Sequence, residues 1–494
     1  MEISRSKRNY RDIIKVSGVF GGVQVFNIIV NIIKSKFVAI LLGPAGMGIL
    51  GLYSSAITFI GYLSNFGLGS STIKNIAEAN SSGDLNRISK TIIILRRLVW
   101  ITGILGSIIF FAGAAWLSQI SFNNSDYTNA FRVLSIVMLV NQLSSGNMAL
   151  LQGLRKLKHL ANASMTGSLL GLLISVPIYY IWGINGIVPT IVVSSLVSFF
   201  RTWYFAKKIE LQDVVVDLEQ TISEGKKMLS MGVMISFSGA ISLGVAYALR
   251  IFISKFGSLD HVGLYSAGFV ILNTYVGIVF NAMGTDYYPK LSSISSSNLK
   301  CSEAMNQQAE ISVLILAPIL ILFIVYIDWI IIILYSSKFL LINEMLHWAV
   351  LGVLFKAISW SVSYVFLAKS ESFLFFWNEL VANIYLIALN FLGYFYFGLR
   401  GLGVSFLISN ILYMFQVYFI SQNRYQFSLK MELIIIFIIQ IILSSISLLV
   451  IIFFGSPYKY IIGTFIVFIA FYYSFYELDR RLGIKELINK FIKK

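Results

Sequence analysis

About fourteen long apolar segments recur along this chain, and they constrain its fold more than any other feature does. A helix needs about 20 apolar residues to cross the hydrocarbon core of a bilayer. Segments of that length lie at roughly 13–41, 46–70, 88–117, 128–151, 160–182, 186–207, 227–254, 262–284, 308–334, 341–367, 372–397, 401–421, 431–455 and 458–477. Since 57% of the residues are hydrophobic and 12% are charged, so much apolar surface does not fit one water-soluble core. We therefore predict an all-α polytopic membrane protein with about 14 transmembrane helices.

The lysines and arginines between these segments orient the chain in the membrane. Basic residues mark cytoplasmic loops, and here they gather in alternate loops, at Lys74, Arg87, Lys90, Arg155, Lys156, Lys158, Lys207, Lys208, Lys226, Lys227, Lys290, Lys300, Lys369, Arg424 and Lys430, and in the tail at Arg480, Arg481, Lys485 and Lys490. The start of the chain is basic as well, at Arg5, Lys7, Arg8 and Arg11, and the apolar run that follows is too long for a cleaved signal peptide. We expect a multi-pass protein of the bacterial inner membrane with both termini in the cytoplasm. This clustering accounts for the net charge of +16 without nucleic acid as a partner.

Glycines and basic residues recur at nearly one offset between the two halves of the chain. Gly18, Lys36 and Gly43 recur as Gly232, Arg250 and Gly257, Gly51-Leu52-Tyr53-Ser54 recurs as Gly263-Leu264-Tyr265-Ser266, and Gly183-x-x-Gly186 recurs as Gly398-x-x-Gly401. Chance matching in a glycine-rich and leucine-rich composition is the alternative. Six helices separate the repeated positions, so the halves are predicted to be parallel repeats around an axis along the membrane normal. We predict an N-lobe at 1–210, an acidic linker and C-lobe at 211–425, and two further helices with a cytoplasmic tail at 426–494.

Charged residues inside the apolar segments are the candidate functional residues, because a charge in hydrocarbon is costly unless a partner or a wet cavity holds it. Lys36 and Arg250 occupy equivalent repeat positions, seven residues before Gly43 and Gly257. Across the repeat axis they would face each other in a central cavity. The alternative is that both side chains snorkel to the periplasmic interface. Lys356 lies many residues from either end of its segment, which favours a cavity or an ion pair.

Further charges are weighed in the same way. Glu379, about seven residues into 372–397, is the expected carboxylate neighbour of Lys356 and our candidate ion-coupling group. Lys34 is a second candidate beside Lys36, with snorkelling as its alternative. Arg96 and Arg97 are adjacent on one helix, so at most one of them is expected to face a lumen. We assign Arg97 to substrate binding. The remaining charges lie near segment ends and are expected to be topological anchors or interfacial groups, namely Arg132, Arg201, Asp286, Glu310 and Asp328.

The sign of the candidate charges and the absence of known catalytic motifs limit the classes of function that this chain can have. A mostly cationic cavity suits an anionic headgroup such as a phosphate or diphosphate, and it suits a cationic drug poorly. The pattern Gly46-x-Gly48-x-x-Gly51 resembles a dinucleotide fingerprint but follows a membrane helix, so it predicts a turn with close helix packing. The chain has no phosphate-binding loop for ATP, no metal-ligand spacing and no catalytic constellation. We expect a transporter that is not an enzyme and that needs no cofactor or metal.

Several segments resemble one known family. Lys36-Phe-Val-Ala39-Ile-Leu-Leu-Gly43-Pro44-Ala-Gly46-Met-Gly48 resembles the first-helix signature of the bacterial Wzx-type polysaccharide flippases. Other positions are similar to family positions in the same order, namely Gly67-Leu-Gly69, Lys74-Asn-Ile-Ala77-Glu78, Leu249-Arg250, Gly263-Leu-Tyr265, Tyr287-Tyr288-Pro289-Lys290-Leu291-Ser292, Lys356 with Ser359-Trp360, and Glu379. The resemblance covers most of residues 10–425. Val353 is a departure, because the family leads us to expect an acidic residue just before the tenth-helix lysine.

The resemblance implies a fold like that of the multidrug and toxin extruders, in the multidrug/oligosaccharidyl-lipid/polysaccharide flippase superfamily. It implies a substrate linked to undecaprenyl diphosphate, such as an O-antigen repeat unit for lipopolysaccharide, moved from the cytoplasmic to the periplasmic leaflet by alternating access. The diphosphate would sit on Lys36, Arg250 and Lys356, and the lipid tail would stay among the membrane lipids. A polysaccharide polymerase and a chain-length regulator are the partners that follow.

Three other functions compete with this one. A lipid II-type flippase would have the same fold and helix count. A small-molecule or drug exporter of the same fold would need an acidic cavity for cationic drugs. A membrane enzyme that polymerises or ligates glycans would need a large extracytoplasmic loop with catalytic groups, and the loops on that side are short here.

Overall fold

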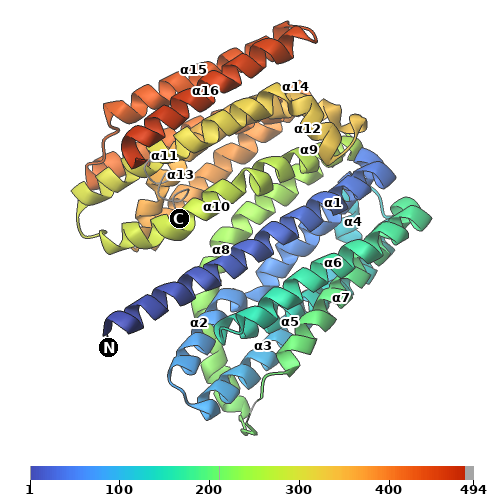
Figure 1. The fold of residues 1–494 in the computed structure, drawn as a ribbon. Coiled ribbons are helices and arrows are strands. Elements are labelled where there is room, and N and C mark those ends of the chain that lie inside the picture. The colour runs from blue at the N-terminus through green and yellow to red at the C-terminus, as the bar shows by residue number, and fades with distance from the viewer. Residues whose placement is uncertain (1, 211, 484–494) are drawn as a thin grey trace. The chain divides into compact units, whose positions relative to one another are not determined.

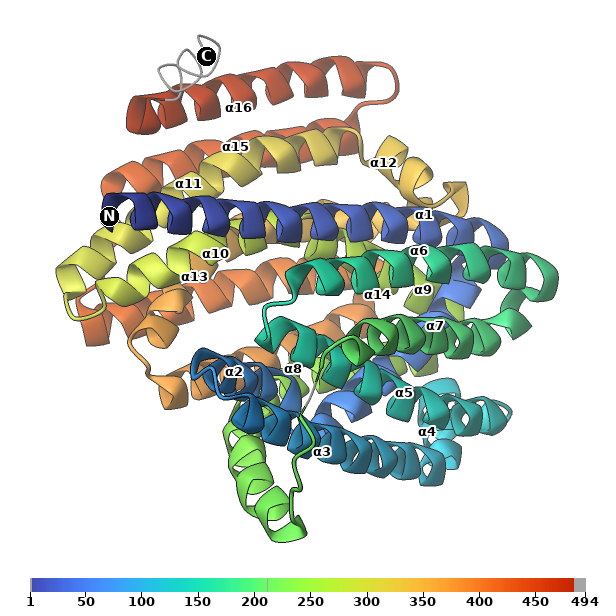
Figure 2. The same ribbon diagram turned by 60° about the horizontal axis from the view of Figure 1, so that its bottom comes forward.

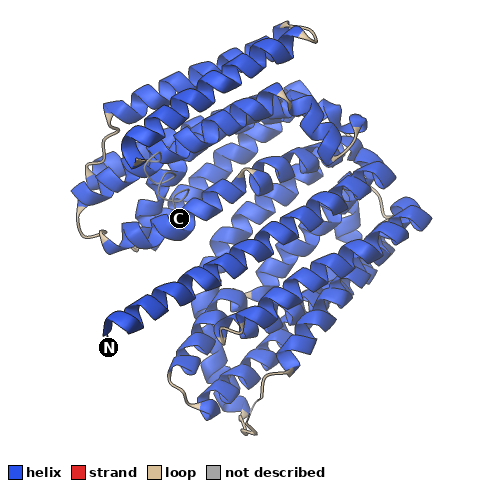
Figure 3. Ribbon diagram, viewed as in Figure 1, coloured by secondary structure: helices blue, strands red, loops and turns tan. Residues whose placement is uncertain are grey.

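A computed structural model describes residues 2–210 and 212–483 of this chain (Figure 1). Within these ranges it does not describe the side chains of residues 2–20, 70, 227, 230–238 and 275. The basic side chains expected to mark the cytoplasm at Arg5, Lys7, Arg8, Arg11, Lys227, Lys485 and Lys490 therefore lie outside the described residues. The described residues form helices joined by short loops, and they contain no strand (Figure 3).

Eleven helices of the described chain are long and apolar enough to cross a membrane, which confirms a multi-pass α-helical membrane protein. Three of them, Gly21–Asn65, Leu157–Lys207 and Ser372–Tyr425, have 45, 51 and 54 residues. At 1.5 Å per residue, each is about twice as long as the hydrocarbon core is thick. Each contains one residue with non-helical backbone, at Gly43, Gly183 or Gly398.

The chain folds back on itself at two of these glycines. Residues eight apart in a straight helix are separated by about 12 Å, yet a β-carbon added at Gly186 would lie 2.9 Å from the Ile178 carbonyl oxygen, and Gly401 packs on the backbone of Gly393. Gly183 has φ 53° and ψ −131°, and Gly398 has φ 58° and ψ −138°. This conformation is open essentially to glycine alone. The glycine pattern found twice in the sequence thus builds the same sharp turn twice.

The described chain divides into two compact units. Unit 1 comprises Met1–Gly263 with Leu334–Ser336, and unit 2 comprises Leu264–Ile333 with Ser337–Lys494. Unit 1 holds α1 (Glu2–Asn65), α2 (Leu68–Ser81), α3 (Leu85–Ala112), α4 (Ala114–Phe122), α5 (Thr128–Gly153), α6 (Leu157–Trp182), the 3-10 turn η1 (Gly183–Gly186), α7 (Ile187–Lys207), α8 (Leu218–Phe256) and the start of α9 (Leu259–Val270). Unit 2 holds the rest of α9, the π-helical η2 (Ile271–Tyr275), α10 (Gly277–Ser293), α11 (Asn298–Val325), most of α12 (Ile327–Leu334), η3 (Ser337–Ile342), α13 (Asn343–Ala368), α14 (Ser372–Tyr425), α15 (Met431–Phe453) and α16 (Tyr458–Leu482).

In unit 1, α3 is the helix around which the linker and the start of α8 pack. Asp84 caps α3 by accepting from the backbone N–H groups of Asn86 at 2.9 Å and Arg87 at 3.3 Å, which satisfies donors that a helix start leaves free. Two clusters of buried residues then join α3 to its neighbours, at Ile76, Ile92, Leu95, Val99 and Leu150, and at Leu68, Ile94, Leu98, Val216 and Met228. The second cluster brings Val216 of the predicted linker into the core of unit 1.

The predicted close packing of the glycine-rich segment after Gly43 is confirmed. A β-carbon at Gly48 would lie 3.1 Å from the backbone nitrogen of Gly263, so the backbones of α1 and α9 touch and no side chain fits between them. The pattern that resembles a dinucleotide fingerprint is therefore a helix-packing element.

In unit 2, α15 and α16 lie beside α11 (Figure 2), and ion pairs join α16 to α11 near one end and to α12 near the other. Arg481 donates to Glu310 at 2.8 Å near one end, and Lys459 donates to Asp328 at 2.7 Å near the other. Between them, buried apolar side chains of α11, α15 and α16 form one cluster, at Ile321, Val325, Val450, Ile466, Val467 and Ala470. Glu310 and Asp328, expected from the sequence to be interfacial groups, thus bind α16 to α11 and α12.

Candidate functional site

The candidate charges of unit 2 lie on two neighbouring helices, Lys356 on α13 and Glu379 on α14. Lys356 lies half-buried near the middle of α13, and its Nζ lies 5.7 Å from the centre of the Phe280 ring on α10. The Lys356 ammonium and the Glu379 carboxylate also interact electrostatically. An ammonium in hydrocarbon needs such neighbours, because the desolvation of an isolated charge is not compensated there. Among the described residues the two groups do not form a direct ion pair, so a functional pairing of Lys356 with Glu379 stays a prediction.

Glu379 is also the centre of a hydrogen-bond network that sequence reasoning missed. The Tyr413 hydroxyl donates to Glu379 Oε1 at 2.6 Å, and the Asn378 amide donates to the same oxygen at 3.5 Å. Gln416 in turn donates to Asn378 Oδ1 at 2.8 Å. Tyr413 lies 34 residues after Glu379 and Gln416 lies 38 residues after Asn378, and these pairs meet because α14 turns back at Gly398. Polar residues inside two apolar segments were the only available signal.

Three candidate cations of unit 1 lie on α1 and α8. Lys34 and Lys36 are half-buried on α1, and Arg250 is half-buried on α8. The Arg250 guanidinium donates to the Ala246 carbonyl at 3.0 Å, one turn back along its own helix. The prediction that Lys36 and Arg250 face each other across an axis stays a prediction.

Arg97 holds the linker that the sequence places after the N-lobe. Its Nη1 donates to the Val216 carbonyl at 3.0 Å and to the Thr221 hydroxyl at 2.7 Å. Nearby, Lys90 pairs with Glu224 at 2.8 Å. These contacts give Arg97 a structural function in unit 1. Its predicted substrate contact stays a prediction, and Arg97 lies with the linker instead of with Lys36 or Arg250.

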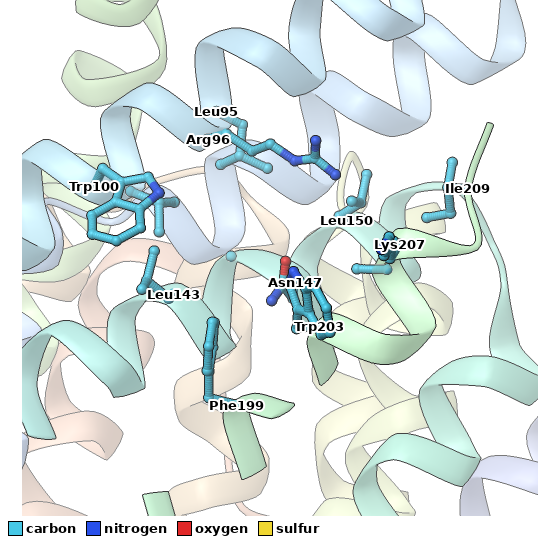
Figure 4. A pocket seen from close by; sticks show the side chains of 13 residues that line it. Leu95, Arg96, Trp100, Leu143, Asn147, Leu150, Phe199, Trp203, Lys207 and Ile209 are labelled. Carbon is cyan, nitrogen blue, oxygen red and sulfur yellow. The ribbon is translucent and has the colours of Figure 1, made fainter. Parts of the chain in front are cut away.

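Arg96, the neighbour of Arg97, lines a pocket of about 420 Å³ in unit 1 (Figure 4). The pocket lies among α3, α5 and α7, and its polar lining residues are Arg96, Asn147 and Lys207. Trp100, Phe199 and Trp203 form its aromatic walls. Lys207 Nζ lies 5.3 Å from the centre of the Trp203 ring, which is a cation–π contact. From the sequence, Lys207 is expected to be one of the basic residues of a cytoplasmic loop. No sequence pattern indicates that it shares a pocket with Arg96.

The described residues contain no group of three or more His, Cys, Asp or Glu side chains that could hold a metal ion. The arrangement is built from single cations in membrane helices, one carboxylate with hydrogen-bond donors, and aromatic walls. Basic side chains of this kind can bind an anion, and the Glu379 carboxylate accepts hydrogen bonds from Tyr413 and Asn378.

Comparisons with known proteins agree with this architecture. The model of a family described as "Polysaccharide biosynthesis protein" matches residues 37–344. The lipid III flippase of Escherichia coli (strain K12) is 22% identical over 346 residues, which is 69% of this chain and 82% of that protein. Relatives of this chain are therefore flippases and transporters.

Two solved structures share the fold. An inward-facing multidrug resistance MATE family transporter of the MOP superfamily has a TM-score of 0.68 at 15% identity, covering 82% of this chain and 94% of that one. The lipid II flippase MurJ in an inward closed conformation has a TM-score of 0.66 at 14% identity, covering 95% of this chain and 99% of that one. The expected all-helical fold like that of the multidrug and toxin extruders is thus found, while the count of about 14 transmembrane helices stays a prediction.

Proposed function

This chain belongs to the polysaccharide biosynthesis protein family, and we propose that it moves an oligosaccharide repeat unit linked to undecaprenyl diphosphate from the cytoplasmic to the periplasmic leaflet of the inner membrane. A polar glycan and a charged diphosphate do not cross about 30 Å of hydrocarbon unaided. A flippase supplies a wet, cationic route for both. O-antigen or a related surface polysaccharide unit is the proposed cargo, with a polymerase and a chain-length regulator as downstream partners.

The observation that carries this proposal is the presence of half-buried basic side chains within spanning helices of both units. Lys36 and Arg250 lie in unit 1 and Lys356 lies in unit 2. Charges at such positions are rare and functional, since each must be paired or hydrated. We propose that they bind the diphosphate in turn as the two units alternate access.

The proposal includes a topology of fourteen crossings with both termini in the cytoplasm. The eleven long helices give this count if α1 reverses at Gly43 as the chain does at Gly183 and Gly398, so that three of the helices cross twice. A β-carbon at Gly46 would clash with the Leu42 side chain, which supports such a reversal. Cysteine accessibility on each side of the membrane tests this topology residue by residue.

We assign Glu379 as the ion-coupling group of this transporter. Its carboxylate has Tyr413 and Asn378 as donors and Lys356 as a neighbouring charge. If Glu379 exchanges a proton during the cycle, Glu379→Gln transports down a substrate gradient but no longer responds to an imposed pH gradient. Equal responses of the variant and the wild type would contradict the assignment.

A drug exporter is the main competing function, because one of the solved structures with this fold is a multidrug resistance transporter. The basic charges of this chain have the wrong sign for cationic drugs. A glycan-polymerising enzyme is less well supported, since the relatives found are flippases and transporters.

The test is flipping of a diphosphate-linked glycolipid in vesicles, read out from one leaflet. We compare the wild type with Lys36→Ala, Arg250→Ala and Lys356→Ala, and use Lys208→Ala, at an exposed position, as the matched control. Loss of a contact to one charged phosphate oxygen costs about 2 kcal/mol, so a drop of about 30-fold is expected for the three variants and little change for the control. Unchanged rates in all three variants would remove these residues from the diphosphate site.

A further inference from the structure

The pocket lined by Arg96 lies beside side chains that face hydrocarbon. On α3, Ile101 and Ile104 are 59% and 45% exposed, and on α7, Phe200 is 56% exposed. Exposed apolar side chains along a spanning helix are typical of a lipid-facing surface. A pocket with such flanks is reached from the bilayer and not from water, so its ligand is expected to be a membrane lipid.

The polar part of the pocket is built for an anion. No hydrogen bond or ion pair of the Arg96 guanidinium occurs among the described residues, and the same holds for the Asn147 side chain. Both side chains are directed into the space between α3 and α5 (Figure 4). Lys207 adds a second positive charge at the end of α7. Two cations and an amide that share one pocket match the oxygens of a phosphate group.

The apolar part of the pocket fits the rest of a lipid. Trp100 and Trp203 are 48% and 45% exposed, so they form walls that are open to the bilayer. Leu143 and Phe199 continue this lining. Tryptophan favours the level where headgroups meet acyl chains, and Lys207 begins the basic run at the expected cytoplasmic end of α7. The cytoplasmic leaflet carries the anionic lipids that such basic residues attract.

We propose that this pocket of unit 1 binds one anionic glycerophospholipid of the cytoplasmic leaflet. Arg96, Lys207 and Asn147 hold its phosphate, and an acyl chain lies along Trp100 and Phe199. The bound lipid fills the space among α3, α5 and α7 and makes unit 1 sensitive to the phospholipid composition of the membrane. This site does not include the proposed cargo-binding cations Lys36, Arg250 and Lys356. Lipid binding at this site can therefore be tested independently of the proposed transport.

The first test measures lipid retention by the purified full chain in native mass spectrometry, with phosphatidylglycerol or phosphatidylcholine added. The wild type should retain one phosphatidylglycerol more tightly than phosphatidylcholine. Each basic residue near an anionic surface contributes about 1 kcal/mol, so Arg96→Gln with Lys207→Gln should weaken this binding about 30-fold. The control Arg132→Gln with Lys208→Gln removes the same charge outside the pocket and should retain the lipid. Equal retention by both double variants would overturn the proposal.

A second test compares two lipids on the wild-type protein and uses no charge variant. Phosphatidylglycerol with brominated chains should quench tryptophan fluorescence of the wild type at a lower mole fraction than brominated phosphatidylcholine does. This difference should vanish in Trp100→Phe with Trp203→Phe. If inorganic phosphate abolishes this difference, the pocket is a free-anion site. If a polyprenyl diphosphate alone has the same effect, the pocket is a cargo site. Either result would contradict a phospholipid site.

Discussion

Removal of the Arg481 guanidinium should weaken the attachment of α16 to α11 within unit 2. Arg481 donates to Glu310 at 2.8 Å and also pairs with Glu477 of its own helix, so one cation stands between two carboxylates. The exposed fractions of the three side chains are 20%, 7% and 12% in that order. Arg481→Ala therefore leaves two nearly buried carboxylates next to each other without a counter-charge.

The cost follows from this burial. Removing one partner of a buried ion pair destabilises a protein by about 3–5 kcal/mol. Because Arg481 keeps a fifth of its side chain exposed, we expect the lower end, about 3 kcal/mol. Arg480 is the matched control, since it is the adjacent arginine and is exposed, and Arg480→Ala should change the free energy of unfolding by less than about 0.5 kcal/mol.

The assay is denaturant unfolding in mixed micelles together with hydrogen exchange. Arg481→Ala should lower the unfolding midpoint and speed amide exchange in α16, with α3 in unit 1 unchanged. A cycle with Glu310→Gln, Arg481→Gln and the double variant should give a coupling free energy of about 1–3 kcal/mol. If Arg481→Ala and Arg480→Ala unfold alike, the ion pair does not hold the C-terminal helices and this reasoning fails.

Two further predictions concern single residues. Gly398→Ala places a β-carbon on a backbone with φ 58° and ψ −138° and should lower the free energy of unfolding by about 1–3 kcal/mol. In the control Gly277→Ala the added carbon meets open space, so this variant should be neutral or stabilising. Equal shifts of the thermal unfolding midpoint in the two variants would contradict a strained turn at Gly398. Arg97→Gln removes the donor to the Val216 carbonyl and should increase protease cleavage in 208–217 with little loss of flipping. A large loss of flipping without increased cleavage would instead support a substrate contact of Arg97.

The membrane architecture could be predicted from the sequence, because each crossing requires its own length of apolar residues. The paired turns at Gly183 and Gly398 could also be predicted, since only glycine adopts their backbone conformation and the pattern occurs twice. An electrostatic influence of Glu379 on Lys356 could be expected from the sequence, because a charge in a spanning segment requires a compensating neighbour and few carboxylates lie in such segments.

Other contacts had no signal in the sequence. The partner of Arg97 is a backbone carbonyl, which any residue at position 216 would supply. Tyr413 reaches Glu379 only because α14 reverses, and nothing in the spacing of 34 residues indicates the contact. Arg96 and Lys207 share a pocket because α3 and α7 both pack on α5, although the sequence separates the two residues by more than 100 positions.

The central claim is that the diphosphate is the feature of the cargo that this chain recognises. The most direct measurement is leaflet-specific flipping of two glycolipids by the wild-type protein, with the same oligosaccharide linked to the polyprenyl chain through a diphosphate or through an uncharged ether. We predict rapid flipping of the diphosphate-linked lipid and little flipping of the ether-linked one. Equal rates for both lipids, or transport of neither alongside efflux of a cationic drug, would contradict the account.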